Sequence, residues 1–138
     1  MKVYVFKSLP PFLWGYTRDI RAMWALEECG IPYETIGLDC GPNGLQDETW
    51  FEAASPFKQV PVIDDDGFVL PESGAILLYL AEKSGKLIPR ELKGRAQVTR
   101  WLITSLNNIE PFSLPIFFAD LQGDSNPPMK ALRPWYVE

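Results

Sequence analysis

The chain has 138 residues, of which 46% are hydrophobic and 22% are charged, and its formal net charge is −5. This length allows one modest core, or one domain and part of another. The negative charge argues against nucleic acid or an anionic membrane as the main partner, and no apolar run reaches the roughly 20 residues of a membrane-spanning helix. The chain contains no histidine, which excludes a Ser-His-Asp triad, a Cys-His pair and a histidine-ligated metal centre.

The two cysteines, Cys29 and Cys40, do not have Cys-x-x-Cys spacing. They therefore indicate neither a disulfide framework nor a zinc site. The first residues, MKVYVFK, are too short and too alternating for a signal peptide. We expect a cytoplasmic protein that carries no metal.

The first elements read as a strand, a loop and a helix. Lys2 to Phe6 is rich in β-forming residues and predicts a buried strand, and Ser8 to Tyr16 contains two prolines and a glycine and predicts a loop. A helix is expected from Arg18 to Glu28, followed by the stop signal Gly30. Its buried stripe should consist of four residues at helical spacing: Ala22, Ala25, Leu26 and Cys29.

A second strand is expected at Tyr33–Leu38, a turn at Gly41–Gly44 and a short helix at Gln46–Ala54. Two further strands follow at Val60–Ile63 and Phe68–Leu70. The pair Asp66-Gly67 between them favours a tight hairpin.

The next helix should run from Ser73 to Lys83, with four inward-facing residues: Ile76, Leu77, Leu80 and Ala81. The resulting order, β-α-β-α-β-β-α, predicts an α/β domain of thioredoxin-like plan at residues 1–84.

The remaining residues predict the start of an all-α domain. A linker is expected at residues 85–93 and a partial helical domain at 94–138. Pro111 and Pro115 should kink or end its long first helix, and Gly123 to Pro128 reads as a loop. The apolar segment from Phe112 to Leu121 predicts a partner surface.

Val60-Pro61 is the first candidate ligand-binding feature. If this peptide bond is cis, the backbone of Val60 turns outward and offers its N–H and C=O to an extended peptide. An ordinary proline at the start of a strand is the alternative.

Glu72-Ser73 is the second candidate. Ser73 lies at a helix start, where free N–H groups favour a carboxylate, and Glu72 suits an ammonium group. A ligand with adjacent amino and carboxylate groups would satisfy both residues. Simple helix capping is the alternative.

The third candidate is the hydroxyl group of Thr17 or Tyr16, just before the first helix. Such a hydroxyl can donate a hydrogen bond to sulfur and stabilise a thiolate. The alternative is N-capping by Thr17 or Asp19, with Tyr16 in the core.

The runs TRDIRAMWALEECGIPYE and SPFKQVPVIDDDGFVLPESGAILLYLAEKSGKLIP resemble the bacterial glutathione transferases over about the first 90 residues. The run KGRAQVTRWLITSLNNIEPF resembles the start of that family's helical domain. The resemblance implies a protein that binds glutathione, stabilises its thiolate and conjugates it to a small hydrophobic electrophile in detoxification, without a metal. It also implies a homodimer.

The resemblance further implies roles for individual residues. Pro61 would be cis, the backbone of Val60 would pair with the cysteinyl part of glutathione, and Gln59 would reach its glycyl carboxylate. Glu72 and Ser73 would hold the γ-glutamyl end.

The resemblance makes Thr17 the leading thiol-activating residue and Tyr16 the alternative, because the window before Arg21 has neither serine nor cysteine. The family's helical domain is normally complete, whereas this chain ends early within it. A catalytically weak glutathione-binding or dimerisation module, or a fragment, is therefore the alternative reading. A glutathione-dependent reductase that acts through Cys29 or Cys40 is a third.

Overall fold

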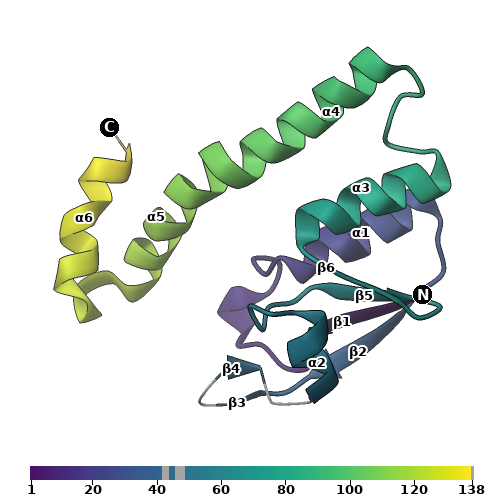
Figure 1. Ribbon diagram of the computed structural model, residues 1–138. Coiled ribbons are helices and arrows are strands. Elements are labelled where there is room, and N and C mark those ends of the chain that lie inside the picture. The colour runs from purple at the N-terminus through teal and green to yellow at the C-terminus, as the bar shows by residue number, and fades with distance from the viewer. Residues whose placement is uncertain (42–43, 46–48, 138) are drawn as a thin grey trace. The chain divides into compact units, whose positions relative to one another are not determined.

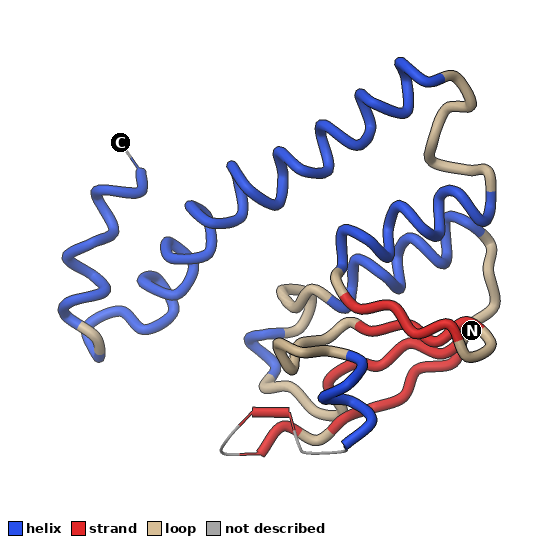
Figure 2. The backbone as a smooth tube through the Cα atoms, viewed as in Figure 1, coloured by secondary structure: helices blue, strands red, loops and turns tan. Residues whose placement is uncertain are grey.

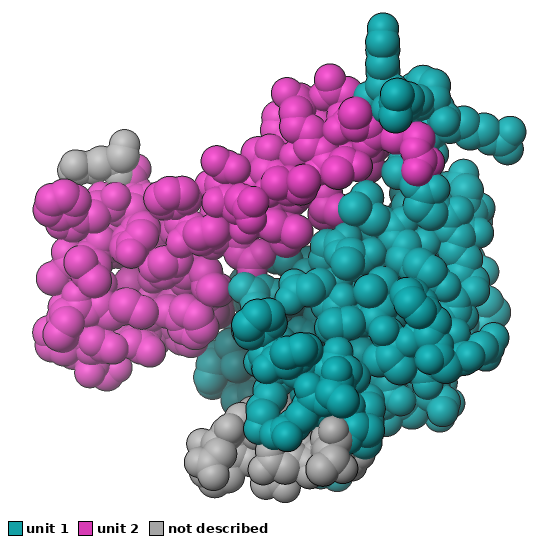
Figure 3. Space-filling view, in the orientation of Figure 1, with its two compact units in different colours: residues 1–94 teal, residues 95–138 magenta. Residues whose placement is uncertain are grey.

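The computed structural model describes residues 1–41, 44–45 and 49–137, and it separates into two compact units, residues 1–94 and 95–138 (Figure 3). Pro42 and Asn43 of the predicted turn lie outside the described residues, as do residues 46–48 of the predicted short helix. The two units are described separately below.

Unit 1 is built on a four-stranded mixed sheet in the order β2-β1-β5-β6 (Figure 2). Its strands are β1 (Lys2–Phe6), β2 (Glu34–Leu38), β5 (Val62–Asp65) and β6 (Phe68–Pro71). Strand β1 pairs in parallel with β2 and antiparallel with β5, and β5 pairs antiparallel with β6. Two short strands, β3 (Cys40–Gly41) and β4 (Gly44–Leu45), form a separate pair.

Helices cover both faces of this sheet. Helices α1 (Asp19–Cys29) and α3 (Ser73–Ser84) lie side by side on one face, and the short helix α2 (Thr49–Ala54) lies on the other (Figure 1). A 3-10 turn, η1 (Pro11–Leu13), occupies the loop after β1. The predicted α/β class and thioredoxin-like plan are confirmed.

The core between the sheet and helices α1 and α3 follows the predicted helical stripes. Val3 and Ile63 supply its sheet side. The helices contribute six buried residues: Ala22, Ala25, Leu26, Cys29, Ile76 and Leu80. Leu77 is partly buried against this cluster, and Ala81 is buried. Helical spacing thus predicted the inward faces of both helices.

The opposite face of the sheet packs against α2. Phe51 of α2 is buried in one cluster with Val60 and Val62, and Tyr4 and Phe6 pack against it. Strand β1 therefore alternates between the two cores, as side chains along a strand must. The strand predicted as buried is buried only in part: among the five residues of β1, Val3 is fully buried, three are half-buried and Lys2 is exposed.

Left-handed residues end both long helices of unit 1. Gly30 after α1 has φ 68° and Gly85 after α3 has φ 67°. The hairpin between β5 and β6 turns through Asp66 (φ 53°) and Gly67 (φ 94°), which confirms the predicted tight turn.

Unit 2 is helical. Helix α4 (Leu92–Thr104) begins two residues earlier than predicted, so the expected linker is shorter. A π-helical turn, η2 (Ser105–Ile109), leads into α5 (Glu110–Gln122). The 3-10 turn η3 (Gly123–Ser125) and helix α6 (Pro127–Val137) follow, where a loop was predicted up to Pro128.

The π-helical turn explains why Pro111 does not end the long helix. Proline has no N–H to donate and its ring crowds the preceding turn. The wider turn adapts to this: the N–H of Glu110 bonds the carbonyl of Ser105, five residues back. Pro115 also lies inside α5. None of the helices within the described residues is long and apolar enough to cross a membrane.

Candidate functional site

The register of the β5–β6 hairpin brings the two strongest sequence candidates to one end of the sheet. Val62, the first residue of β5, pairs with Pro71, the last residue of β6. Pro61 and Glu72 are the next residues outward on the two strands, so both lie beyond this pair. The peptide bond between Val60 and Pro61 is cis.

The loop that enters β5 is held by a buried serine. The hydroxyl of Ser55 donates to the carbonyl of Gln59 at 3.0 Å and accepts from the N–H of Gln59 at 3.1 Å. The side chain of Gln59 is exposed. Ser55 therefore fixes the backbone next to Val60, while the side-chain amide of Gln59 stays exposed to solvent.

The turn from β6 into α3 has an unusual backbone. Glu72 occupies the N-cap position of α3 with φ 73° and ψ 110°, and its side chain is exposed. A positive φ is uncommon for a residue with a Cβ, and such outliers gather at functional sites. Ser73, the first helical residue, is only 7% exposed.

The start of α1 lies against the start of α3. Arg21, in the first turn of α1, places Nη1 3.4 Å from the Oγ of Ser73. Three segments consequently meet at this end of unit 1: the loop before β5, the β6–α3 turn and the first turn of α1. The free N–H groups of a helix start and the guanidinium favour an anion here.

The capping alternative for the loop before α1 is wrong in its details. The N-cap residue is Arg18 and makes no side-chain capping hydrogen bond, while Asp19 is already helical and accepts from the N–H of Ile20 at 3.1 Å. Tyr16 is 67% exposed, so the core role considered for it is also wrong. Thr17 is half-buried and directly precedes the N-cap.

Cys29 is a core residue, as its position on the helical stripe predicted. It is 4% exposed, and the hydroxyl of Ser84 lies 3.2 Å from its sulfur. A thiolate needs access and an electropositive setting to react, and burial opposes both. The side chain of Cys40 lies outside the described residues.

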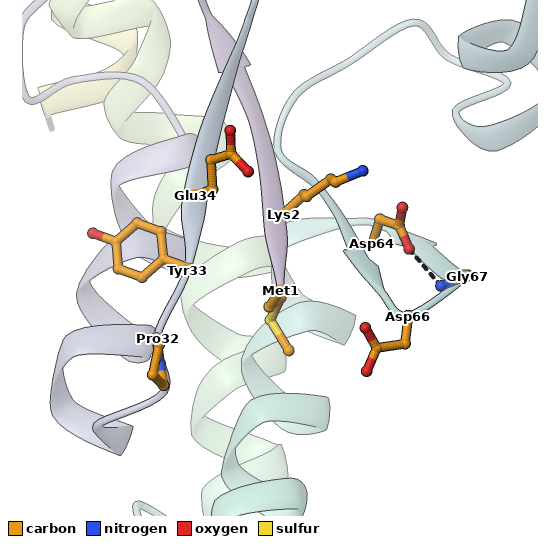
Figure 4. A pocket seen from close by; sticks show the side chains of 8 residues that line it. All are labelled: Met1, Lys2, Pro32, Tyr33, Glu34, Asp64, Asp66 and Gly67. Carbon is orange, nitrogen blue, oxygen red and sulfur yellow. Dashed lines mark hydrogen bonds between the residues drawn. The ribbon is translucent and has the colours of Figure 1, made fainter.

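A surface pocket of about 460 Å³ lies at the opposite end of the strands (Figure 4). Lys2 lies there between its register partners Glu34 and Asp64, so a positively charged residue stands between two negatively charged ones on three neighbouring strands. Burial and a hydrogen bond to Glu27 raise the pKa of Tyr33, which lines this pocket. We interpret this region as a cross-strand charge cluster. No group of three or more His, Cys, Asp or Glu residues suited to a metal occurs among the described residues.

Sequence reasoning missed two residues of the candidate site. Ser55 was considered only as the first residue of a longer motif. A serine side chain can, however, form hydrogen bonds with backbone groups a few residues further along a loop, as Ser55 does with Gln59. Arg21 was used only to locate the window in which a thiol-activating residue was expected. Its contact with Ser73 joins residues 52 positions apart, so no local pattern could have found it.

A family model of known proteins matches the region of the chain that contains this site. Residues 12–82 match the family model described as "Glutathione S-transferase, N-terminal domain". Glutathione S-transferase F10 of Arabidopsis thaliana is 33% identical over 111 residues, which cover 75% of this chain and 51% of that protein. The disulfide-bond oxidoreductase YfcG of Escherichia coli (strain K12) is 40% identical over 93 residues, covering 62% of this chain and 43% of that protein.

Solved structures agree with these matches. A glutathione transferase family member from Pseudomonas fluorescens pf-5, with two glutathione bound, superposes with a TM-score of 0.77 at 28% identity. The match covers 99% of this chain and 59% of that one. The chain spans about half the length of the curated relatives it matches, 51% and 43% for the two above. The family model accounts for residues 12–82, the part that contains all three segments of the candidate site, and on this ground the chain belongs to the glutathione S-transferase family.

Proposed function

We propose that this chain binds glutathione at the end of unit 1 where Val60–Pro61 and Glu72–Ser73 lie beyond the Val62–Pro71 pair. That register is the observation that carries the proposal, because the cis Val60–Pro61 bond then lies at the same end of the sheet as the N-terminus of α3. The backbone of Val60 would pair with the cysteinyl part of the peptide. Glu72 would take the γ-glutamyl ammonium, Ser73 its carboxylate, and Gln59 the glycyl carboxylate.

The proposed chemistry is conjugation of glutathione, through its sulfur, to an electrophilic small molecule. The hydroxyl of Thr17, or alternatively of Tyr16, donates a hydrogen bond that stabilises the thiolate, and the thiol proton passes to solvent. The thiolate then forms a carbon–sulfur bond while the leaving group departs with its electron pair. The contribution of the protein is electrostatic stabilisation and positioning, with no metal.

We further propose that the protein acts in the cytoplasm, where glutathione is kept reduced, and that its role is detoxification. A homodimer is proposed because unit 2 carries exposed aromatic side chains, including Phe112 and Trp135. Light scattering at several protein concentrations tests the dimer.

Two measurements test the main proposal: binding of glutathione by calorimetry, and conjugation of a generic chloronitrobenzene electrophile. Thr17→Ala should lower turnover about 100-fold, the usual loss for one stabilising donor, while glutathione binding changes little. Thr17→Ser, which keeps the hydroxyl, is the matched control. A loss in Tyr16→Phe with Thr17→Ala unaffected would assign the role to Tyr16. Binding without any turnover would favour a binding module over an enzyme.

A second candidate is glutathione-dependent disulfide reduction, favoured by the 40% identity to a disulfide-bond oxidoreductase. One glutathione thiolate would attack a disulfide sulfur and release a thiolate, and a second glutathione would cleave the mixed disulfide to give oxidised glutathione. Burial of Cys29 disfavours this cysteine as the attacking group. A Cys29→Ser, Cys40→Ser double variant should keep full reductase activity if glutathione supplies both sulfurs. Loss of that activity in the double variant would instead support a reductase that acts through Cys29 or Cys40.

A further inference from the structure

The loop between β1 and α1 is a series of hydrogen-bonded turns. In η1 the N–H of Leu13 donates to the carbonyl of Pro10 at 2.9 Å, and the N–H of Tyr16 donates to the carbonyl of Leu13 at 3.1 Å. The carbonyl of Thr17 accepts from the N–H of Ile20, in the first turn of α1, at 3.4 Å. Thr17 therefore stands between two sets of turns, those of η1 and those of α1.

The side chain of Trp14 adds a hydrogen bond to this loop. Its indole Nε1 donates to the carbonyl of Leu9, five residues back, at 3.0 Å. The two residues after Leu9 are Pro10 and Pro11, which have no N–H, so the indole supplies a donor where backbone donors are scarce. The side chain of Trp14 is 67% exposed, and its contribution to the loop is therefore this hydrogen bond more than burial of its ring.

Gly15 separates this hydrogen bond from the candidate thiol-activating residues. Its φ is 83°, and a Cβ at this position would meet no atom within 4 Å. Glycine adopts several backbone conformations at little energetic cost, and the open space leaves room for them. Without a further restraint the chain could rotate at Gly15, and Thr17, which lies outside α1, would then occupy several positions instead of one.

We propose that Trp14 is a positioning residue that holds the Thr17 hydroxyl in place to donate a hydrogen bond to the glutathione sulfur. This inference rests on the proposed function, in which that hydroxyl stabilises the thiolate. Trp14 acts through the loop: its indole ties η1 to the carbonyl of Leu9, and the turns of η1 lead to Thr17. A donor that is already in place when the thiolate forms needs no reorganisation, so a looser loop should stabilise the thiolate less.

The test measures the pKa of the thiol of bound glutathione. Ultraviolet absorbance of the thiolate, followed over pH, gives this pKa without any electrophile. Trp14→Phe removes the indole N–H and keeps an aromatic ring. It should raise the pKa by about 0.5–1, which is an about three- to tenfold weaker stabilisation of the thiolate and the size of one net hydrogen bond. An unchanged pKa would overturn the inference.

A second ligand shows whether the effect is confined to the thiolate. S-methylglutathione has no ionisable thiol, so calorimetry should give nearly the same dissociation constant for this ligand in Trp14→Phe and in the wild-type protein. A purely structural role of Trp14 would instead weaken binding of S-methylglutathione by as much as it weakens stabilisation of the thiolate, and that result would contradict the proposal.

Trp24→Phe is the matched control. Trp24, on α1, is also 67% exposed, and its indole Nε1 donates to Oε1 of Glu28, likewise at 3.0 Å. This variant loses the same kind of hydrogen bond from a helix instead of from the loop, and the thiol pKa should stay at the wild-type value. An equal rise in Trp24→Phe would show a general effect of losing an exposed tryptophan and would overturn the assignment to Trp14.

A double-mutant cycle tests whether Trp14 acts through Thr17. In a Thr17→Ala background, Trp14→Phe should cause no further rise in the thiol pKa, because the hydroxyl that it positions is already gone. A rise as large as that in the wild-type background would show that Trp14 acts independently of Thr17, and the inference would fail. If the wild-type protein does not bind glutathione, or leaves the thiol pKa near its free value of about 8.5, the proposed function itself fails, so the two failures are distinguishable.

Discussion

Val62 pairs with Pro71 across the β5–β6 hairpin, and this pair sets the positions of both segments proposed to bind glutathione. A shift of one residue in this register would turn the side chains of β5 to the opposite face. Val62 and Ile63 would then exchange the two cores in which they are buried. The packing of the two cores therefore maintains the geometry of the candidate site.

Ser55→Ala should destabilise the protein and weaken glutathione binding. The buried Ser55 hydroxyl makes both hydrogen bonds to the Gln59 backbone, and their loss should lower the free energy of unfolding by about 1–3 kcal/mol. Urea denaturation measures this. The control is Ser113→Ala, an exposed serine whose hydroxyl bonds the carbonyl of Glu110, which should change stability by less than about 0.5 kcal/mol. Equal effects of the two variants would contradict the role of Ser55.

Glu72→Gly should stabilise the protein while it weakens ligand binding. Glu72 holds φ 73°, a value that glycine adopts without the Cβ clash, so unfolding should require about 1 kcal/mol more. The proposed ammonium partner is lost in the same change. Glu72→Gln keeps the Cβ and should bind glutathione weakly at unchanged stability. Thermal melts and calorimetry separate the two effects, and a less stable Glu72→Gly would be the contrary result.

The carboxylate of Asp65 should contribute to the free energy of unfolding at neutral pH, and this contribution should be lost in acid. The side chain of Asp65 is 9% exposed. Hydrogen bonds from Lys83 and then Tyr79 hold the pKa of this carboxyl below its usual value. The folded state thus binds the proton less tightly than the unfolded state, where the pKa is about 3.9. The contribution of Asp65 is therefore present above that value and is lost as pH falls through the lower folded pKa.

Denaturation at several pH values between about 7 and 3 measures this effect. Asp65→Asn should lower stability at neutral pH by about 1–2 kcal/mol and flatten the loss below about pH 5. Asp124→Asn is the control, since the side chain of Asp124 is 90% exposed and pairs with Lys130 at the surface. If Asp65→Asn left the acid dependence unchanged, other carboxyl groups would be responsible for it.

Lys86 should stabilise the end of α1. Its Nζ donates to the carbonyl of Cys29, the last residue of the helix, at 2.9 Å. A cation at a helix C-terminus interacts favourably with the unpaired carbonyls, so Lys86→Met should lower the free energy of unfolding by roughly 0.5–1 kcal/mol. Lys86→Arg keeps the charge and should retain most of the stability. A drop in salt sensitivity of the melting temperature in Lys86→Met would support an electrostatic origin.

Local patterns predicted most of unit 1. Period-two and period-3.6 spacing identified its main strands and long helices, and glycine and proline identified their ends. These signals lie within a few residues of each other, so they can be read without knowledge of the fold. They were less reliable in unit 2, where Pro111 was predicted to kink or end the long helix and Gly123 to begin a loop. Helical structure continues past Pro111 through the π-helical turn η2, and Gly123 begins the short 3-10 turn η3 that leads into α6.

The candidate site residues between Gln59 and Ser73 could be predicted from the sequence. They lie on a strand, a hairpin and a helix start, which are local structures with local sequence signals. Folding added contacts that join distant positions. The Arg21–Ser73 hydrogen bond exists because α1 and α3 pack side by side on one face of the sheet. The burial of Ser73, at the start of α3, likewise follows from that packing. Side-chain partners across such distances depend on how whole elements pack, and no spacing along the chain encodes them.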